Sequence, residues 1–270
     1  MDAIRPHNPR LRTRGFSLIE LLVTLAVVAA ISSLMFPAFG KVRQAALGLM
    51  CQNNMRSIYM GLEHFRNDNN DRLPDSAYAP RDPSRGKPLR PQELMALTGD
   101  ERDANGNVKW DGLGQLFGRR GDGAGRYLGD ARVFYCPAHG SVHTFERYEP
   151  AFKASSTSIS AKSKEAVYGN YHYWDAWNRA AIARQGAGKG QKTHPIAQNV
   201  ILTDGMRTRQ DFSHRFGCNA LNQDGSVMWV GGNKLERAVR SLPTAEIEVQ
   251  PYDRQLQIFE GIVAAIEPAR

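Results

Sequence analysis

The sequence predicts an α+β fold in which one long N-terminal helix packs on an antiparallel β-sheet with loop insertions. Three observations lead to this expectation. An apolar run occupies residues 16–36, an amphipathic helical pattern follows over residues 37–66, and strand-like runs separated by turn residues recur within residues 67–270. The chain of 270 residues is long enough for one globular domain attached to such a helix.

The apolar run contains a single charged residue, the carboxylate Glu20. As an α-helix, residues 16–36 would extend about 31 Å, which matches the hydrocarbon thickness of a bilayer. A carboxylate held inside lipid costs at least about 2.5 kcal/mol. Glu20 therefore needs either a partner or a function.

Basic residues flank this run unequally. Four arginines precede it within the first fifteen residues, whereas Lys41 and Arg43 follow it. The more basic flank is expected to stay in the cytoplasm, which sends the C-terminal body across the membrane. A cleaved secretory signal peptide and an uncleaved single-pass anchor both fit this pattern, but neither gives Glu20 a role.

Cleavage after Gly15 provides such a role. Phe16 would then carry a new amino terminus, and Glu20 would lie one helical turn away on the same face. The amine and the carboxylate neutralise each other within one chain or between neighbouring chains. Pairing between neighbours would set the axial register of packed helices. Glu20 is therefore interpreted as an assembly residue.

The segment "RGFSLIELLVTLAVVAAISSLMFP" resembles the N-termini of type IV pilins and type II secretion pseudopilins, which share its Gly-Phe junction, its glutamate and a proline at the position of Pro37. The resemblance implies a pilin-like fold with a leader at residues 1–15, cleavage after Gly15 by a prepilin peptidase and N-methylation of Phe16. It also implies assembly with other pilin-like subunits, identical or different, into a fibre. The subunit would sit in the inner membrane as a single-pass protein, with its N-terminus cytoplasmic and its globular domain extracytoplasmic.

Beyond the apolar run, Pro37 removes one helical hydrogen bond and is expected to kink or loosen the helix. A stripe of apolar residues then repeats at three- and four-residue steps: Val42, Ala45, Ala46, Leu49, Met55, Ile58, Leu62 and Phe65. Such a stripe requires a sheet to cover it. The helix is thus expected to be embedded in the membrane over residues 16–36 and to pack on the globular domain over residues 37–66.

Within the globular domain, residues 168–174 and 199–204 read as strands, and residues 216–232 read as a hairpin that turns at Asp224-Gly225. The segment "RYLGDARVFYCP" resembles the first strand of pseudopilin-like domains. Residues 178–197 are expected to form an exposed loop, and "DANGN" at residues 103–107 a turn rather than a calcium loop. A C-terminal helical stripe is expected to dock on the core: Leu256, Phe259, Val263 and Ile266.

His214 precedes Asp224-Gly225 by nine intervening residues. This spacing resembles the His-x9-Asp-Gly motif of a large group of pseudopilin-like proteins, although Ser226 stands where a bulky residue or histidine usually follows. If a strand separates them, His214 and Asp224 are up to about 30 Å apart and cannot share one metal ion. We therefore expect Asp224 to shape the turn and His214 to form a hydrogen bond at the other end of the strand, with Asp204 as a candidate partner.

Cys51 and Cys136 are the candidates for a disulfide, because Cys51 lies on the helix face near the sheet and Cys136 is placed at the end of the first strand. Cys218 is expected to be a small buried apolar residue. The three cysteines lack the paired spacing of a zinc site, so no metal is expected.

The net charge of +8 is not arranged as a basic stripe interleaved with aromatic residues, which argues against nucleic-acid binding. No catalytic residues and no cofactor are predicted, because a nucleophile elbow, a metal cluster and paired carboxylates are all lacking. A structural subunit of a fibre is the favoured interpretation. The alternatives are a minor tip subunit or anchored adhesin that contacts a ligand through residues 75–131 and 175–197, and a membrane-anchored hydrolase.

Overall fold

A computed structural model describes residues 16–79, 90–117, 127–154, 160–161, 163–186, 199–214, 217–244 and 252–266. The chain divides into two compact units, Met1–Ala45 and Ala46–Arg270. Helix α1 contributes to both units, and each unit is described by itself. The leader predicted at residues 1–15 lies outside the described residues.

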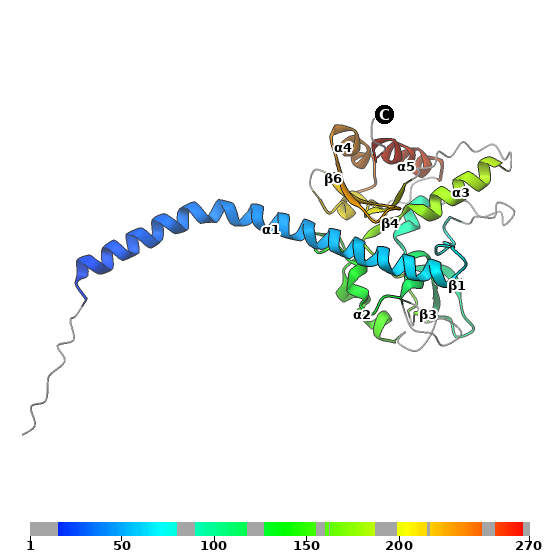
Figure 1. Cartoon of the computed structure of the whole chain (residues 1–270), viewed down its shortest axis with the longest axis horizontal. Helices are drawn as coiled ribbons and strands as arrows, with labels where there is room; N and C mark the ends of the chain where they lie inside the picture. The colour runs from blue at the N-terminus through cyan, green and yellow to red at the C-terminus, as the bar shows by residue number, and fades with distance from the viewer. Residues whose placement is uncertain are drawn as a thin grey trace, which may run out of the picture. The chain divides into compact units, whose positions relative to one another are not determined.

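The elements are as follows (Figure 1). The α-helices are α1 Leu18–Asp68, α2 Phe145–Ala154, α3 Trp174–Gly186, α4 Asn233–Arg240 and α5 Tyr252–Ile266. The strands are β1 Thr98–Arg102, β2 Val108–Trp110, β3 Ser160–Ala161, β4 Tyr171–Tyr173, β5 Val200–Asp204, β6 Gly217–Asn222 and β7 Val227–Gly231. The 3-10 helices are η2 Pro91–Met95, η3 Gly112–Leu116, η4 Ala131–Phe134 and η5 Arg209–Asp211. The predicted α+β class is confirmed.

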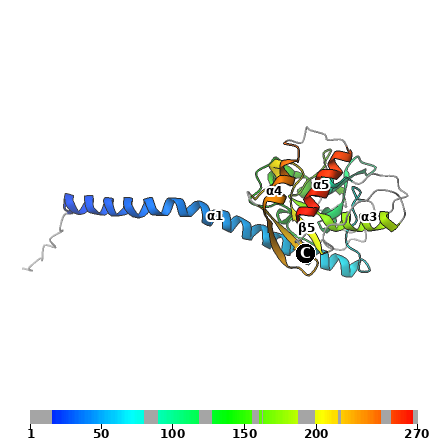
Figure 2. The same cartoon turned by 90° about the horizontal axis from the view of Figure 1, so that it is seen from above.

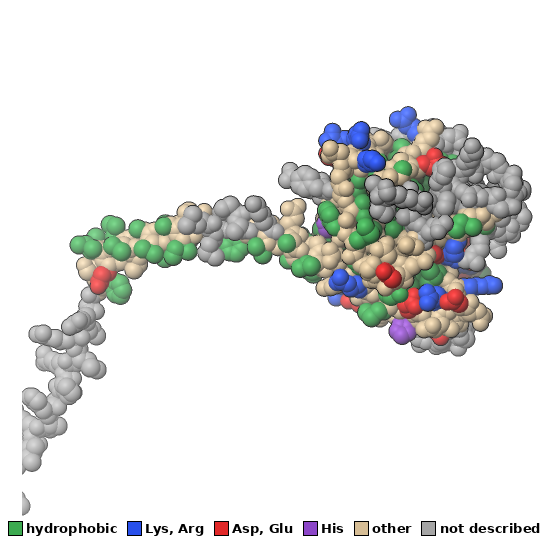
Figure 3. All heavy atoms as spheres, turned by 45° about the horizontal axis from the view of Figure 1, so that its top comes forward, with side chains coloured by type: hydrophobic (Ala, Val, Ile, Leu, Met, Phe, Trp, Pro, Cys, Tyr) green, Lys and Arg blue, Asp and Glu red, His purple; other side chains and the backbone are tan. Residues whose placement is uncertain are grey.

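In the first unit, α1 exposes its large apolar side chains (Figure 3). Their exposed fractions lie between 52% and 79% for ten residues: Phe16, Leu18, Ile19, Leu21, Leu22, Val23, Leu25, Val27, Val28 and Ile31. Among the residues that the structure describes, no helix combines the length and the apolar character that a membrane crossing needs. The helix runs without interruption through residue 37, and the kink expected at Pro37 stays a prediction.

In the second unit, the same helix becomes buried. Cys51, Met55, Ile58 and Leu62 are fully buried, as the spacing of the stripe predicts for the last three. The prediction of a covered stripe is wrong for its earlier part, because Val42 and Leu49 have exposed fractions of 65% and 60%. The physical reason is that the covering contacts begin only near Cys51, where Gln52 and Asn54 donate hydrogen bonds to Asn219 and to the carbonyl of Tyr135.

The main sheet is antiparallel, with strand order β4-β5-β6-β7. Tyr171 of β4 is paired with Asp204 of β5, and Leu221 of β6 with Val227 of β7 across the turn. The strands and the hairpin predicted for residues 168–174, 199–204 and 216–232 are therefore confirmed, with shorter bounds.

Strand alternation sends different side chains to the two faces of this sheet. Asp204 and Asn219 lie on the face that receives the second half of α1, since Asn219 accepts a hydrogen bond from Gln52. The other face is covered by α4 and α5 (Figure 1, Figure 2). There the ring of His172 packs against Trp174 and against Phe259 of α5. The predicted docking of the C-terminal helix is confirmed, because its four stripe residues are all buried.

A second, smaller antiparallel sheet has the strand order β1-β2-β3. The turn between β1 and β2 contains the "DANGN" segment, where Asp103 Oδ1 accepts hydrogen bonds from the backbone N–H groups of Asn105 and Asn107. These bonds hold a tight turn, as the sequence predicts.

The predicted first strand in "RYLGDARVFYCP" is wrong. Residues Ala131–Phe134 form the 3-10 helix η4, because the Asp130 carboxylate accepts a hydrogen bond from the N–H of Arg132 and starts a turn. Cys136 follows η4 outside any strand. Its N–H donates to the side chain of Asn170, 3.1 Å away, instead of to a neighbouring strand.

The predicted exposed loop at residues 178–197 is also corrected. Its first part, through Gly186, belongs to helix α3. The side chains of Trp174, Trp177 and Ala180 recur at three-residue steps and are fully buried, which stabilises a helix on the core. Residues 187–198 lie outside the described residues.

The buried His172 should give the protein a defined pH dependence. Burial lowers the pKa of His172 to about 3, and its Nδ1 accepts a hydrogen bond from the N–H of Met206. Between pH 6 and 4 the unfolded chain therefore binds a proton at this position that the folded chain does not, so stability falls as the pH falls. One proton corresponds to about 1.4 kcal/mol per pH unit.

The variant His172→Asn keeps an acceptor for Met206 and removes the titration. We expect the free energy of unfolding, measured by denaturant titration from pH 6 to 4, to fall less steeply in the variant by the slope of one proton. Comparing slopes makes the result independent of any uniform loss of stability. Equal slopes in the two proteins would show that His172 does not govern this dependence.

Candidate functional site

The start of α1 places the carboxylate of Glu20 at the helix terminus. The N–H of Ser17 donates to Glu20 Oε2 at 3.0 Å, and the carbonyl of Ser17 accepts from the N–H of Leu21 at 3.2 Å. The Glu20 side chain thus turns back toward the position at which Phe16 enters the helix. A carboxylate here is also stabilised by the positive end of the helix dipole.

Helix α1 is attached to the globular unit by a disulfide between Cys51 and Cys136, with a Cα–Cα distance of 5.1 Å. Both cysteines are buried, and Asn54 of the next helical turn donates a hydrogen bond to the carbonyl of Tyr135. The bond closes a loop of 85 residues between the helix and the segment after η4. Cys218 is a free, buried thiol on β6.

His214 lies beside this disulfide, immediately before β6. Its Nε2 is 3.4 Å from Asp204 Oδ2, 3.3 Å from Asn219 Nδ2 and 3.7 Å from Cys136 Sγ. Asp204 Oδ2 also accepts hydrogen bonds from the backbone N–H and the side-chain amide of Asn219, at 2.6 and 3.0 Å. The structure therefore places His214 next to Asp204, the partner that the sequence suggested.

The electrostatics of this cluster favour neutral groups. Burial raises the pKa of Asp204 to about 7 and lowers the pKa of His214. Burial also raises the pKa of the Cys218 thiol, which lies on the opposite face of β6. A buried histidine and a buried carboxyl group next to each other therefore keep their polar atoms without a net charge.

The second half of the predicted motif lies at the other end of β6. Gly225 has a φ of +81°, and Asp224 Oδ1 accepts hydrogen bonds from the N–H and the hydroxyl of Ser226. These hydrogen bonds lower the pKa of Asp224. Strand β6 separates His214 from Asp224, so the two residues take part in two different local structures.

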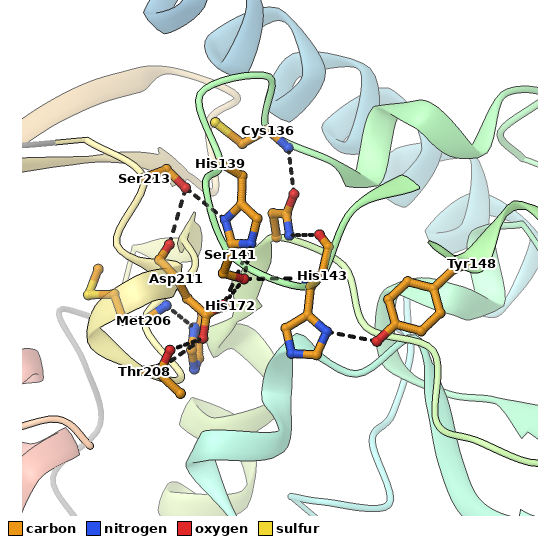
Figure 4. A network of polar contacts seen from close by, with 11 residues as sticks. Cys136, His139, Ser141, His143, Tyr148, His172, Met206, Thr208, Asp211 and Ser213 are labelled. Carbon is orange, nitrogen blue, oxygen red and sulfur yellow. Dashed lines mark hydrogen bonds and ion pairs between the residues drawn. The ribbon is translucent and has the colours of Figure 1, made fainter. Parts of the chain in front are cut away.

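A buried network of His139, Ser141, Asp211 and Ser213 was missed by the sequence analysis (Figure 4). His139 Nε2 is 2.6 Å from Ser141 Oγ, which donates to Asp211 Oδ1 at 2.7 Å, while His139 Nδ1 is 3.0 Å from Ser213 Oγ. No local signal reveals it, because its residues come from segments about seventy positions apart.

These residue types also occur in catalytic triads, but the arrangement is different. Ser141 lies between the histidine and the carboxylate, and the side chains of His139 and Asp211 are only 2% and 1% exposed. Asp211 also accepts hydrogen bonds from the N–H and the hydroxyl of Thr208, both at 2.8 Å. The network therefore connects the loop after Cys136 to the end of η5 as a structural contact.

A cavity of about 420 Å³ opens between α1 and the η4–α2 region. Its lining includes Met50 and Asn54 of α1, Cys136, His139 and Glu146. One of the two disulfide-bonded cysteines, Cys136, thus lines the cavity.

Comparison with known proteins identifies one segment of the chain. Residues 10–36 match the family described as the prokaryotic N-terminal methylation motif. A search of curated proteins found no match to the chain, and a search of solved structures found none either. The matched segment contains Gly15, Phe16 and Glu20, so the chain carries a prepilin-type signal of the kind found in type IV pilin-like proteins.

The turn at Gly225 provides a test of how the hairpin rests on α1. A Cβ atom on Gly225 would lie 2.7 Å from the ring of Tyr59, whose hydroxyl donates to the carbonyl of Gln223. Gly106 has almost the same φ, +79°, with open space around it. Gly106→Ala should cost about 1–2 kcal/mol for its backbone conformation alone.

Gly225→Ala should cost at least about 1 kcal/mol more than Gly106→Ala, because Tyr59 or the turn must move. Denaturant unfolding of the two variants and the parent measures the difference. Equal losses of unfolding free energy in the two variants would mean that the turn does not press against α1.

Proposed function

We propose that the chain is the precursor of a pilin-like subunit of a type II secretion system or a type IV pilus-like system. A prepilin peptidase cleaves after Gly15, Phe16 is N-methylated, and the mature subunits polymerise through the first half of α1. The observation that carries this proposal is the methylation motif at residues 10–36 on a helix whose large apolar side chains are exposed. No catalytic activity and no cofactor belong to this role.

The exposed apolar residues support a membrane-resident subunit that enters a fibre. Burying one large aliphatic or aromatic side chain contributes roughly 1.5–3 kcal/mol. Ten such residues between Phe16 and Ile31, already partly covered, would therefore gain at most roughly 15–30 kcal/mol on leaving water for lipid or for a bundle of like helices. In this proposal residues 16–36 lie in the inner membrane, the basic leader stays cytoplasmic, and residues 67–270 lie outside the cytoplasm.

The position of Glu20 supports its proposed role in assembly. Its carboxylate already contacts the N–H of Ser17, the residue next to the proposed new terminus. After cleavage the ammonium group of Phe16 would lie within the same helical turn. A carboxylate and an ammonium group in low-dielectric surroundings attract each other strongly, and pairing between adjacent subunits fixes the axial offset of their helices.

Three variants in cells that carry the matching assembly system separate processing from polymerisation. Gly15→Leu should leave the leader uncut. Glu20→Val should be cut normally but should accumulate as a membrane-resident monomer, with fibre recovery reduced at least tenfold. Thr24→Val is the matched control, because it removes a polar side chain one turn later without removing a charge, and it should assemble normally.

An immunoblot reports cleavage, and recovery of sheared fibres reports assembly. Normal fibre recovery from Glu20→Val would contradict the pairing role of the carboxylate. Normal maturation of Gly15→Leu would contradict the proposed cleavage site and with it the pilin-like function.

A further inference from the structure

Four potential metal ligands meet under the second half of α1. Atoms of Cys51, Cys136, Asp204 and His214 all lie within 4.8 Å of one another. They come from α1, from the segment after η4, from the end of β5 and from a position three residues before β6. All four residues are buried, with exposed fractions of 7% or less.

Two distances between these atoms fit a tetrahedral zinc site. Zinc–ligand distances of about 2.3 Å for sulfur and 2.0–2.2 Å for nitrogen and oxygen require ligands about 3.4–3.8 Å apart. The distance from Cys136 Sγ to His214 Nε2 is 3.7 Å, and that from His214 Nε2 to Asp204 Oδ2 is 3.4 Å. The two sulfurs are closer than this, because a covalent bond joins them.

The surroundings of the cluster also resemble those of a metal site. Asn219 donates two hydrogen bonds to Asp204 Oδ2 and would hold the carboxylate in place, as groups around metal ligands commonly do. Asp204 Oδ1 is buried, and within the described part of the chain it has no hydrogen-bond donor. A buried carboxyl oxygen without a donor is costly, and a cation that Oδ1 coordinates would relieve that cost.

We propose that Cys51, Cys136, Asp204 and His214 bind one Zn²⁺ ion when the disulfide is opened. Two thiolates, one imidazole and one carboxylate are a ligand set suited to zinc, and with four protein ligands the site is structural. The ion would replace the disulfide as the link between α1 and the sheet, so the domain keeps this attachment under reducing conditions.

A dithiol reductant can open the disulfide between Cys51 and Cys136. Its thiolate attacks Cys51 or Cys136, and its second thiol completes the exchange, which leaves two cysteine thiols in the protein and a disulfide in the reductant. Binding of Zn²⁺ then releases the two thiol protons. The 420 Å³ cavity, which Cys136 lines, gives the reductant and the ion a path to the site.

Cobalt(II) is a suitable probe, because it takes the place of zinc and absorbs light. The full chain, in detergent and without a histidine tag, is reduced with a phosphine while Co²⁺ is present. We expect one Co²⁺ per chain, with the thiolate charge-transfer and visible bands of a tetrahedral site, and displacement of the cobalt by Zn²⁺. The oxidised protein should bind none, although its amino-acid sequence is identical.

Variants assign the ligands. Cys136→Ser removes one of the two thiolates and should weaken the charge-transfer band, and His214→Gln should bind Co²⁺ at least tenfold more weakly. Cys218→Ser is the matched control, because Cys218 is also buried on β6 but faces away from the cluster, and it should bind as the parent does. Thermal unfolding of each variant before reductant and Co²⁺ are added shows whether it is folded.

The proposal is overturned if the reduced parent binds no stoichiometric cobalt or if His214→Gln binds as tightly as the parent. Loss of binding in Cys218→Ser alone would likewise place the metal elsewhere. A reduced chain that unfolds and stays unfolded with Co²⁺ present also contradicts the proposal, because an ion bound to the folded chain must stabilise it.

Discussion

The apolar first half of α1 is the constraint on which the rest of this molecule depends. Ten large apolar side chains lie exposed between Phe16 and Ile31, and the described part of the chain does not cover them. The same helix, from Cys51 onward, buries Met55, Ile58 and Leu62 completely. Within the described residues, one continuous helix therefore has an exposed apolar first part and a buried second part.

The division of α1 into an exposed and a buried part gives a reason for the several contacts that attach its second half to the domain. In the proposed fibre, the helix would connect the assembly to the domain and must then not slide on that domain. The disulfide from Cys51 to Cys136, the hydrogen bond from Gln52 to Asn219 and the contact of Tyr59 with the β6–β7 turn fix it at three points. Strand β6 connects two of these points, since Asn219 lies in the strand and Gly225 in the turn that follows it. The spacing from His214 to Asp224-Gly225 is thus the length of a strand that lies against α1.

Features set by local patterns could be predicted from the sequence, whereas those set by distant contacts could not. The Asp224-Gly225 hairpin follows from a turn that needs positive φ between two apolar runs, and the buried stripe of Met55, Ile58 and Leu62 follows from helical periodicity. Cys51 was placed with Cys136 by reasoning about which faces approach each other, although the strand assumed to end at Cys136 is η4 and an extended segment.

Other features depended on contacts that the sequence does not display. Residues 178–186 of helix α3 were predicted as a loop because the glycine-rich continuation outweighed the helical pattern that the buried Trp174 and Trp177 begin. For His214 the sequence suggested only a hydrogen bond with Asp204, since only the fold brings both cysteines to this histidine. The same limit applies to the network of His139 and Asp211, whose residues are far apart along the chain.

The most direct measurement is the mass and N-terminal sequence of the mature protein extracted from membranes of the native cells. The account predicts a chain that begins at Phe16 and carries one methyl group on its terminal nitrogen. A chain that begins at Met1, or at any residue beyond Ala30, would contradict it, because the Phe16 amine and Glu20 would then not meet at the start of the helix.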